Sequence, residues 1–274
     1  MEEITAFSTI FLNRNISHSM METSVAHRDV AEAGAGPHHP IETNAIITNN
    51  TSHHQTALNH RNEERNSMAD PRLIRSTLYA LRDSNRIETA LQNLTRLDQW
   101  LDIQVEAETR KQTAKRIVNY HGTTMILMAL SQWKDTSKDL SGIIIHILVN
   151  LSFLVPTTIP LIANAGLQLV LFTVRAYPND YAVTSNAVGL LHNCAEYQMK
   201  STNDHDYETS KQVSSEDCLN LVMQTMKKWP TSSYHQERGC LYLYEMSKLA
   251  EPRRVLLHDK SVCSLLVQTL EAHR

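Results

Sequence analysis

The sequence is poor in the residues and motifs that mark several common classes of protein. It has seven glycines, four phenylalanines and four cysteines among 274 residues. It contains no Gly-rich phosphate loop, no GxSxG, no HExxH and no closely spaced carboxylate pair on an apolar helix. The alternating apolar pattern with turn dipeptides, typical of β-strands, is also missing. We therefore expect no β-sheet and no enzyme activity, with no catalytic residues, no cofactor and no metal ion.

Charge and cysteine usage narrow the class further. The formal net charge is −3, and no long cluster of Lys and Arg occurs, so we expect no nucleic-acid partner. The cysteines form no CxxC pair, and all four fall in apolar helical stretches, where a free cysteine packs as a small buried hydrophobe. The N-terminus has no basic segment followed by a sustained apolar run. These features predict a cytoplasmic protein, with the nucleus as the other compartment. The cysteines are Cys194, Cys218, Cys240 and Cys263.

The first 69 residues differ in composition from the remainder. They contain 12 Ile, Leu, Val or Phe residues but 22 Thr, Asn or His residues. A strongly apolar fraction below about 20% makes a hydrophobic core hard to assemble. We therefore predict a disordered polar leader over residues 1–69 and a folded domain over residues 70–274.

One long uncharged stretch raises the alternative of a membrane protein. Residues 140–174 contain no Asp, Glu, Lys or Arg, and about 20 apolar residues span a bilayer. Pro156 and Pro160 interrupt the stretch, however, and His146 and Asn150 would lie unpartnered at membrane depth. We therefore expect buried core helices and no membrane partner. A membrane-associated helical protein with this segment inserted remains an alternative.

Internal repeats give the most informative pattern. IVNYHGTTMILMAL aligns with LIANAGLQLVLFTV so that Gly122 falls on Gly166, 44 residues later. Asp217 and Ser261 take the same place in two later copies, at intervals of 51 and 44. The polar insert over residues 200–215 accounts for the longer interval and is predicted to be an exposed loop. A period of 40–47 residues is typical of helical solenoids.

A second family of helices has the same irregular period. Asn150, Asn193 and Glu245 occupy one equivalent position in IIHILVNLS, AVGLLHNCA and CLYLYEMSK, at intervals of 43 and 52. The turn signals WKDTSKD, YPND and WPTSS precede these helices. LQLVLFTV and AVTSNAVGLLHNCAEY each have apolar residues at i, i+3, i+4 and i+7, and a single helix cannot bury such a stripe by itself. Neighbouring units must therefore cover one another in a continuous core.

At these residues the sequence resembles the armadillo family. NAGLQLVLFTVRAYPNDYAVTSNAVGLLHNCAEY is similar to one nearly complete repeat, with Gly166 opening the helix after the corner at Pro156 and Pro160. LNLVMQTMKKWPTSSYHQERGCLYLYEMSKLA is similar to another. The resemblance covers residues 117–274 well and residues 71–100 weakly. It implies an all-α fold, a right-handed armadillo or HEAT-like α-solenoid of about three to four repeats.

The resemblance also implies a binding function. In armadillo proteins the third helices line a concave groove, where an asparagine ladder binds the backbone of an extended peptide. The matching positions are Asn150 and Asn193, with Asn93 as an earlier member and Glu245 at the third position. A side-chain amide can donate to and accept from a peptide unit, whereas Glu245 would attract a basic partner. The function implied is a non-enzymatic scaffold for a protein or extended peptide, of undefined oligomeric state.

The residues one helical turn from Asn150, Asn193 and Glu245 should lie on the same concave face. These residues are His146, Tyr197 and Lys248. Nuclear-import receptors of the family place Trp four positions before each asparagine, but this chain has His146, Gly189 and Leu241, which argues against classical import-signal recognition. The alternative for the asparagines is that they only cap or brace neighbouring helices. A helical enzyme is a third and less favoured hypothesis.

Overall fold

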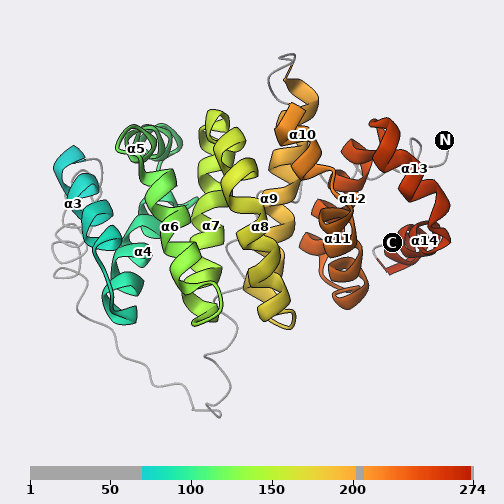
Figure 1. The fold of residues 1–274 in the computed structure, drawn as a ribbon, viewed down its shortest axis with the longest axis horizontal. Coiled ribbons are helices and arrows are strands. Elements are labelled where there is room, and N and C mark those ends of the chain that lie inside the picture. The colour runs from blue at the N-terminus through green and yellow to red at the C-terminus, as the bar shows by residue number, and fades with distance from the viewer. Residues whose placement is uncertain (1–69, 202–206, 273–274) are drawn as a thin grey trace, which may run out of the picture. The chain divides into compact units, whose positions relative to one another are not determined.

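The computed structural model describes residues 70–201 and 207–272, and all regular secondary structure in these residues is helical (Figure 1). They belong to one compact unit, residues 65–274. The all-α class is therefore confirmed, whereas the predicted disordered leader, residues 1–69, lies outside the described residues. The helices are α3 (Pro71–Arg82), α4 (Ile87–Leu101), α5 (Ala107–Asn119), α6 (Gly122–Trp133), α7 (Lys138–Leu154), the 3₁₀ helix η2 (Pro156–Thr158), α8 (Ile159–Ala176), α9 (Tyr181–Lys200), α10 (Tyr207–Val213), α11 (Glu216–Lys228), α12 (Ser233–Ser247), α13 (Ala250–His258) and α14 (Lys260–Ala272).

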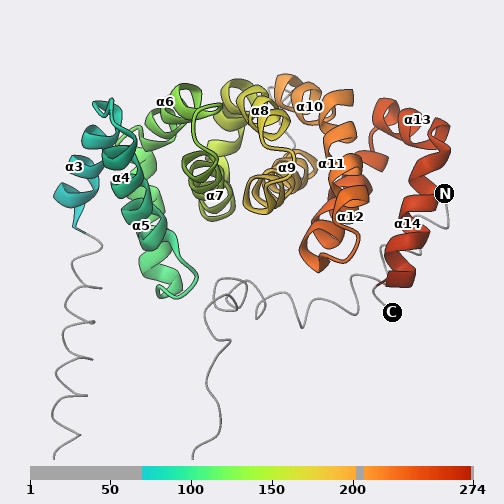
Figure 2. The same cartoon turned by 90° about the horizontal axis from the view of Figure 1, so that it is seen from below.

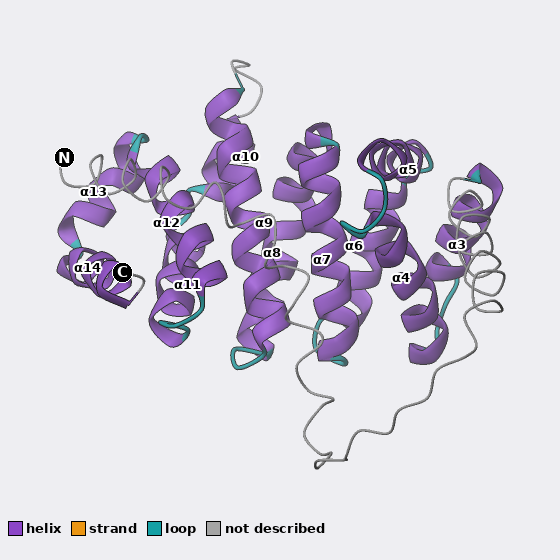
Figure 3. Cartoon of the chain, turned by 180° about the vertical axis from the view of Figure 1, so that it is seen from behind, coloured by secondary structure: helices purple, strands orange, loops and turns teal. Residues whose placement is uncertain are grey.

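The longer helices pack in two rows. In the first row, α3, α6, α8, α11 and α14 contact one another in that order. In the second row, α4, α7, α9 and α12 do the same. Each helix of the second row also contacts a partner in the first, as α7 does with α6 and α9 with α8. Figure 2 shows the two rows side by side, and Figure 3 shows the same helices from behind.

The core lies between and within these rows. Leu151 on α7 and Leu190 on α9 are each 0% exposed and lie between packed helices. The buried residues of α9 extend nearly all around the helix, because α7 and α12 cover it on opposite sides. No single helix pair could bury this surface alone, so the successive units depend on one another.

The N-termini of three second-row helices have the register of the sequence repeats. Ser137, Asp180 and Ser232 are the N-caps of α7, α9 and α12, and the side chain of each accepts a bond from a backbone N–H in the first turn. Residue numbers 137, 180 and 232 are separated by 43 and 52, the intervals predicted for this helix family. Such caps fix where a helix begins. The irregular period is therefore present in the positions of the helix ends.

The predicted exposed loop over residues 200–215 is partly wrong, because the segment includes α10. Thr209 and Val213 lie four residues apart on one face of this short helix and are buried, at 2% and 0% exposure. The Val213 carbonyl accepts a 2.7 Å hydrogen bond from the buried Tyr242 hydroxyl of α12. One valine and one threonine in a polar run gave too weak a pattern to predict a helix.

The prediction that Gly166 opens its helix is also wrong. Helix α8 begins at Ile159, so Pro160 lies in its first turn, where no intrahelical N–H bond is lost. Gly166 lies inside α8, and a Cβ there would come within 2.7 Å of Leu127 Cδ2 on α6. The glycine thus permits close approach of two first-row helices.

One cysteine departs from its predicted environment. Cys194, Cys218 and Cys240 are buried and unpaired, as expected of small hydrophobes. Cys263 is also unpaired, but it lies on an exposed face of α14. Apolar neighbours in the sequence therefore did not determine which side of this helix packs inward.

The uncharged stretch forms most of α7, then η2 and α8. Among the described residues, one helical segment, Pro156–Ala176, is long and apolar enough to cross a membrane, with a mean hydropathy of 1.5. In this fold 56% of its apolar window is buried. Core helices of soluble proteins have the same length and composition, so the segment by itself favours neither location.

Burial of the two leucines predicts a large loss of stability on truncation. We expect Leu151→Ala and Leu190→Ala each to lower the free energy of unfolding by about 2–5 kcal/mol, because each leaves a cavity between stacked helices. Leu257→Ala on α13 is the matched control, since Leu257 is 59% exposed. Urea unfolding measures all three. A loss below about 0.5 kcal/mol for either core variant would contradict this packing.

Candidate binding surface

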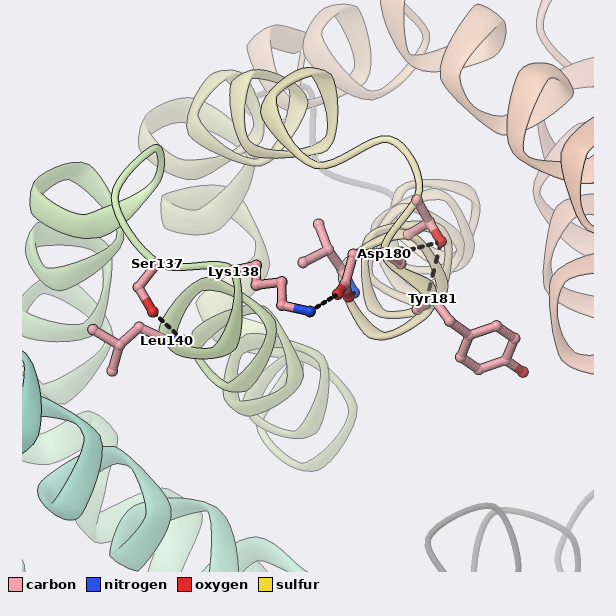
Figure 4. A network of polar contacts seen from close by, with 7 residues as sticks. Ser137, Lys138, Leu140, Asp180 and Tyr181 are labelled. Atoms are coloured by element: carbon pink, nitrogen blue, oxygen red, sulfur yellow. Dashed lines mark hydrogen bonds and ion pairs between the residues drawn. The ribbon is translucent and has the colours of Figure 1, made fainter. Parts of the chain in front are cut away.

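The second row places the predicted site residues on neighbouring helices. Figure 4 shows how α7 and α9 are aligned at their N-termini, where Lys138 Nζ of α7 lies 3.6 Å from Asp180 Oδ2. Asp180 also caps α9 by accepting from the backbone N–H of Val183 at 3.0 Å. One carboxylate therefore starts α9 and pairs with α7. Tyr181 extends from the same turn in the opposite direction, toward His235 of α12.

His146 and Asn150 are brought together on α7 and joined to α4. His146 Nδ1 lies 2.7 Å from Asp98 Oδ1, and His146 Nε2 lies 3.5 Å from Asn150 Nδ2. Nδ1 therefore carries the proton donated to Asp98, and in the neutral ring Nε2 accepts from the amide. The His146 side chain is 45% exposed. This carboxylate, imidazole and amide form one polar chain across two helices.

The environment of His146 favours its charged form. Partial burial lowers the pKa of His146, but the hydrogen bond with Asp98 and the charges of Asp98 and Asp102 outweigh that effect and raise the pKa above its ordinary value. The imidazole thus carries more positive charge near neutral pH than a free histidine does. It can donate from Nε2 to a partner when it is protonated.

Asn193 is bonded to the neighbouring helix. Its Nδ2 donates to the Val149 carbonyl at 3.2 Å and to Ser152 Oγ at 2.9 Å, both on α7. An amide nitrogen has two hydrogens, so both are used within the fold. Asn186, two turns earlier on α9, donates to the Gly142 carbonyl at 3.1 Å in the same way. These contacts favour the bracing interpretation for Asn193.

Glu245 and Lys248 also lie together, on α12. Lys248 Nζ forms a 2.6 Å ion pair with Glu245 Oε2 and lies 4.1 Å from the centroid of the Tyr244 ring. Across the interface, the charge of Glu245 contributes to raising the pKa of Lys200 on α9, after the larger effect of a hydrogen bond with Glu196. Opposite charges thus alternate from α9 to α12.

The remaining members of the predicted set lie in different surroundings. Tyr197 is half-buried on α9, one turn beyond Asn193. Asn93 on α4 is only 7% exposed and donates to the Thr89 carbonyl of its own helix at 2.9 Å. A buried side chain cannot meet a partner, so Asn93 does not belong to this surface.

Several polar residues of the second row were not predicted from the sequence. Arg238 on α12 lies beside His192 on α9, with Nη1 and Nδ1 3.1 Å apart. Glu196 and Lys200 form an i,i+4 pair on α9, a spacing that could have been noticed as a helical ion pair. Asp98 gave no signal, because its contact with His146 joins positions 48 residues apart.

Gly189 explains why an import-receptor tryptophan has no place here. A Cβ at position 189 would come within 2.5 Å of the Tyr234 hydroxyl on α12. The packing of α12 against α9 therefore occupies the space that a large side chain would need.

Among the described residues, no group of three or more His, Cys, Asp or Glu side chains is placed to hold a metal ion.

The two contacts of Asn193 predict a loss of stability on truncation. Asn193→Ala should lower the free energy of unfolding by about 1–3 kcal/mol, because it removes two hydrogen bonds between α7 and α9. Asn220→Ala on α11 is the control, since Asn220 is exposed. Thermal or urea unfolding distinguishes them, and equal stability of the two variants would exclude a bracing role.

The Asp98 contact predicts how His146 titrates. We expect a raised pKa for His146 and a lower pKa in Asp98→Asn, because burial is then opposed only by the smaller effect of Asp102. Since the folded-state pKa is raised, the pair stabilises the fold below the unfolded-state pKa, and this stabilisation is lost as pH rises through the folded-state pKa. NMR titration of the imidazole, assigned with His146→Gln, measures the shift. Asp139→Asn on the exposed side of α7 should leave it unchanged, and an unaltered pKa in Asp98→Asn would contradict the proposed cause.

Comparison with known proteins gives no relative from which a function could be transferred. No family model, no curated protein and no solved structure matches the chain. The geometry of the second row is therefore the basis for any proposal of function.

Proposed function

We propose that residues 70–274 form an armadillo-type α-solenoid that binds an extended protein segment without catalysing a reaction. The order of the helices supports the fold. Helices α5, α6 and α7 form a group of three, and α10, α11 and α12 form another. Between them, η2, α8 and α9 have the same order, with the first helix reduced to a 3₁₀ turn. The third members of these groups, α7, α9 and α12, are successive neighbours in the second row.

The single observation that carries the binding proposal is the continuity of polar side chains across the second row. Asp98, His146 and Asn150 are linked across α4 and α7. Glu196 and Lys200 continue on α9, and Glu245 and Lys248 follow on α12. Carboxylate, amide, imidazole and ammonium groups thus succeed one another over four helices. An extended chain offers a regular series of N–H and C=O groups, to which such side chains are complementary.

The site residues have unequal parts in this proposal. His146, Asn150 and Lys248 present groups that can reach a partner, and Tyr197 supplies an aromatic face beside them. Glu245, whose side chain is 14% exposed, pairs with the Lys248 ammonium. Asn193 contributes mainly by holding α9 to α7, since both its amide hydrogens are bonded there. Because the exposed groups include both signs of charge, we propose a mixed-charge protein segment as the partner. We propose no nucleic acid or membrane as partner, and the cytoplasm or nucleus as the site of action.

Selection from a random library of extended peptides tests the proposal on the full chain. We expect enriched peptides to lose affinity by about fivefold to a hundredfold for Asn150→Ala combined with Glu245→Ala, because each change removes a hydrogen-bonding group worth about 0.5–1.5 kcal/mol. Isothermal titration calorimetry gives the dissociation constants.

A matched control uses the first row. Asn164→Ala combined with Gln168→Ala removes two exposed polar side chains of α8 and should leave affinity unchanged. The melting temperature of each variant shows whether the fold persists. Failure to enrich any peptide, or loss of binding only in the α8 variant, would overturn the proposed surface.

A further inference from the structure

Two buried histidines lie at one helix interface. His192 on α9 is 6% exposed, and His235 on α12 is 0% exposed. Both face the contact between α9 and α12, one of the principal packings of the second row. A buried imidazole is stable in its neutral form, because burial penalises the charged one. The interface therefore depends on two groups that titrate near physiological pH when they are exposed to water.

His235 is enclosed by hydroxyl groups and aromatic rings. Its Nε2 lies 3.2 Å from Thr184 Oγ1, and its Nδ1 lies 2.8 Å from Ser232 Oγ. Its ring stacks on Trp229 with centroids 5.7 Å apart and meets Tyr181 edge-on at 4.9 Å. Both hydrogen-bond partners of the ring among the described residues are uncharged hydroxyls, and burial lowers the pKa of His235 to about 4.

His192 faces a permanent positive charge. Arg238 Nη1 lies 3.1 Å from His192 Nδ1, and since a guanidinium has only donors, Nδ1 must be the acceptor. A proton on Nδ1 would therefore place two donors and two positive charges against each other. Burial first, and then the charge of Arg238, lower the pKa of His192 to about 4, with Lys200 acting in the same direction and Glu196 opposing it.

We infer that the α9–α12 interface is an acid-sensitive joint, at which protonation of His192 and His235 releases α12 from α9 while α4, α7 and α9 stay packed. The contrast with the adjacent interfaces supports this inference. Asn186 and Asn193 join α9 to α7 through amides, which do not titrate. His146 joins α7 to α4 through Asp98, a contact that protonation strengthens. The histidine contacts at this joint are present whether or not the second row binds a partner.

The direction of the pH effect follows from the lowered pKa values. Stabilisation by a neutral buried histidine is complete above the unfolded-state pKa of about 6.5 and is lost as pH falls toward the folded-state value of about 4. Between pH 7 and pH 5, linkage with these values increases the opening equilibrium constant about 20-fold for each histidine. If both protonate on opening, the increase is on the order of several hundredfold.

Hydrogen exchange of the full chain at pH 7 and pH 5 tests the joint. Protection factors, corrected for the intrinsic pH dependence of exchange, should fall at pH 5 by about 20-fold to several hundredfold in α12 and the facing part of α9. Those of α4 and α7 should change by less than about threefold. Equal changes in α7 and α12 would overturn the inference.

Variants separate the histidines from other acid effects. In His192→Asn combined with His235→Asn, the ratio of the protection factors at pH 7 and pH 5 should fall nearly to one, because asparagine forms hydrogen bonds without titrating. His258→Asn changes an exposed histidine of α13 and should retain the full ratio. NMR titration of the unaltered chain gives a second measurement that needs no variant. An imidazole pKa above about 6 for both histidines, or an undiminished ratio in the double variant, would contradict the joint.

Discussion

The packing of α9 between α7 and α12 is the contact on which the second row depends. Helix α9 buries residues on nearly every side, including the four consecutive residues Val188, Gly189, Leu190 and Leu191. A helix that is apolar on nearly all sides is not stable alone in water. Its apolar surface therefore requires both neighbours. The small residues Ala187 and Gly189 let those neighbours approach closely, as the position of Tyr234 against Gly189 shows. The continuity of the polar surface across the row follows from this packing.

Polar atoms at the two faces of α9 are matched by different chemistry. Toward α7, the amides of Asn186 and Asn193 donate to backbone carbonyls and a hydroxyl. Toward α12, imidazoles meet hydroxyls and a guanidinium. Leaving any of these groups unpaired in the interior costs about 1–3 kcal/mol, which disfavours a shift in helix register. The polar contacts thus specify which residues face one another, while the leucines and valines supply most of the burial.

Much of the fold could be predicted from periodicity, because the caps Ser137, Asp180 and Ser232 repeat with the apolar pattern. What could not be predicted depends on contacts between distant positions. Asn193 has the residue type of a binding ladder, but its use as a brace is set by Ser152 and Val149, 41 and 44 residues earlier. Helix α10 likewise exists because Val213 meets Tyr242, 29 residues away. A periodic pattern identifies equivalent helix positions but does not show which neighbour an individual polar group contacts.

The equivalence of repeat positions therefore does not imply equivalent chemistry. Asn150 and Asn193 occupy the same place in successive helices, but Asn150 lies beside the half-exposed His146, whereas Asn193 donates into α7. The difference arises one turn earlier, where α7 carries His146 and α9 carries Gly189. The imidazole reaches outward to Asp98 of the preceding helix, whereas the glycine admits Tyr234 of the following one. At this one position α7 presents a titratable group to solvent, whereas α9 packs its next neighbour closely, and the surface chemistry therefore differs between two helices of the same row.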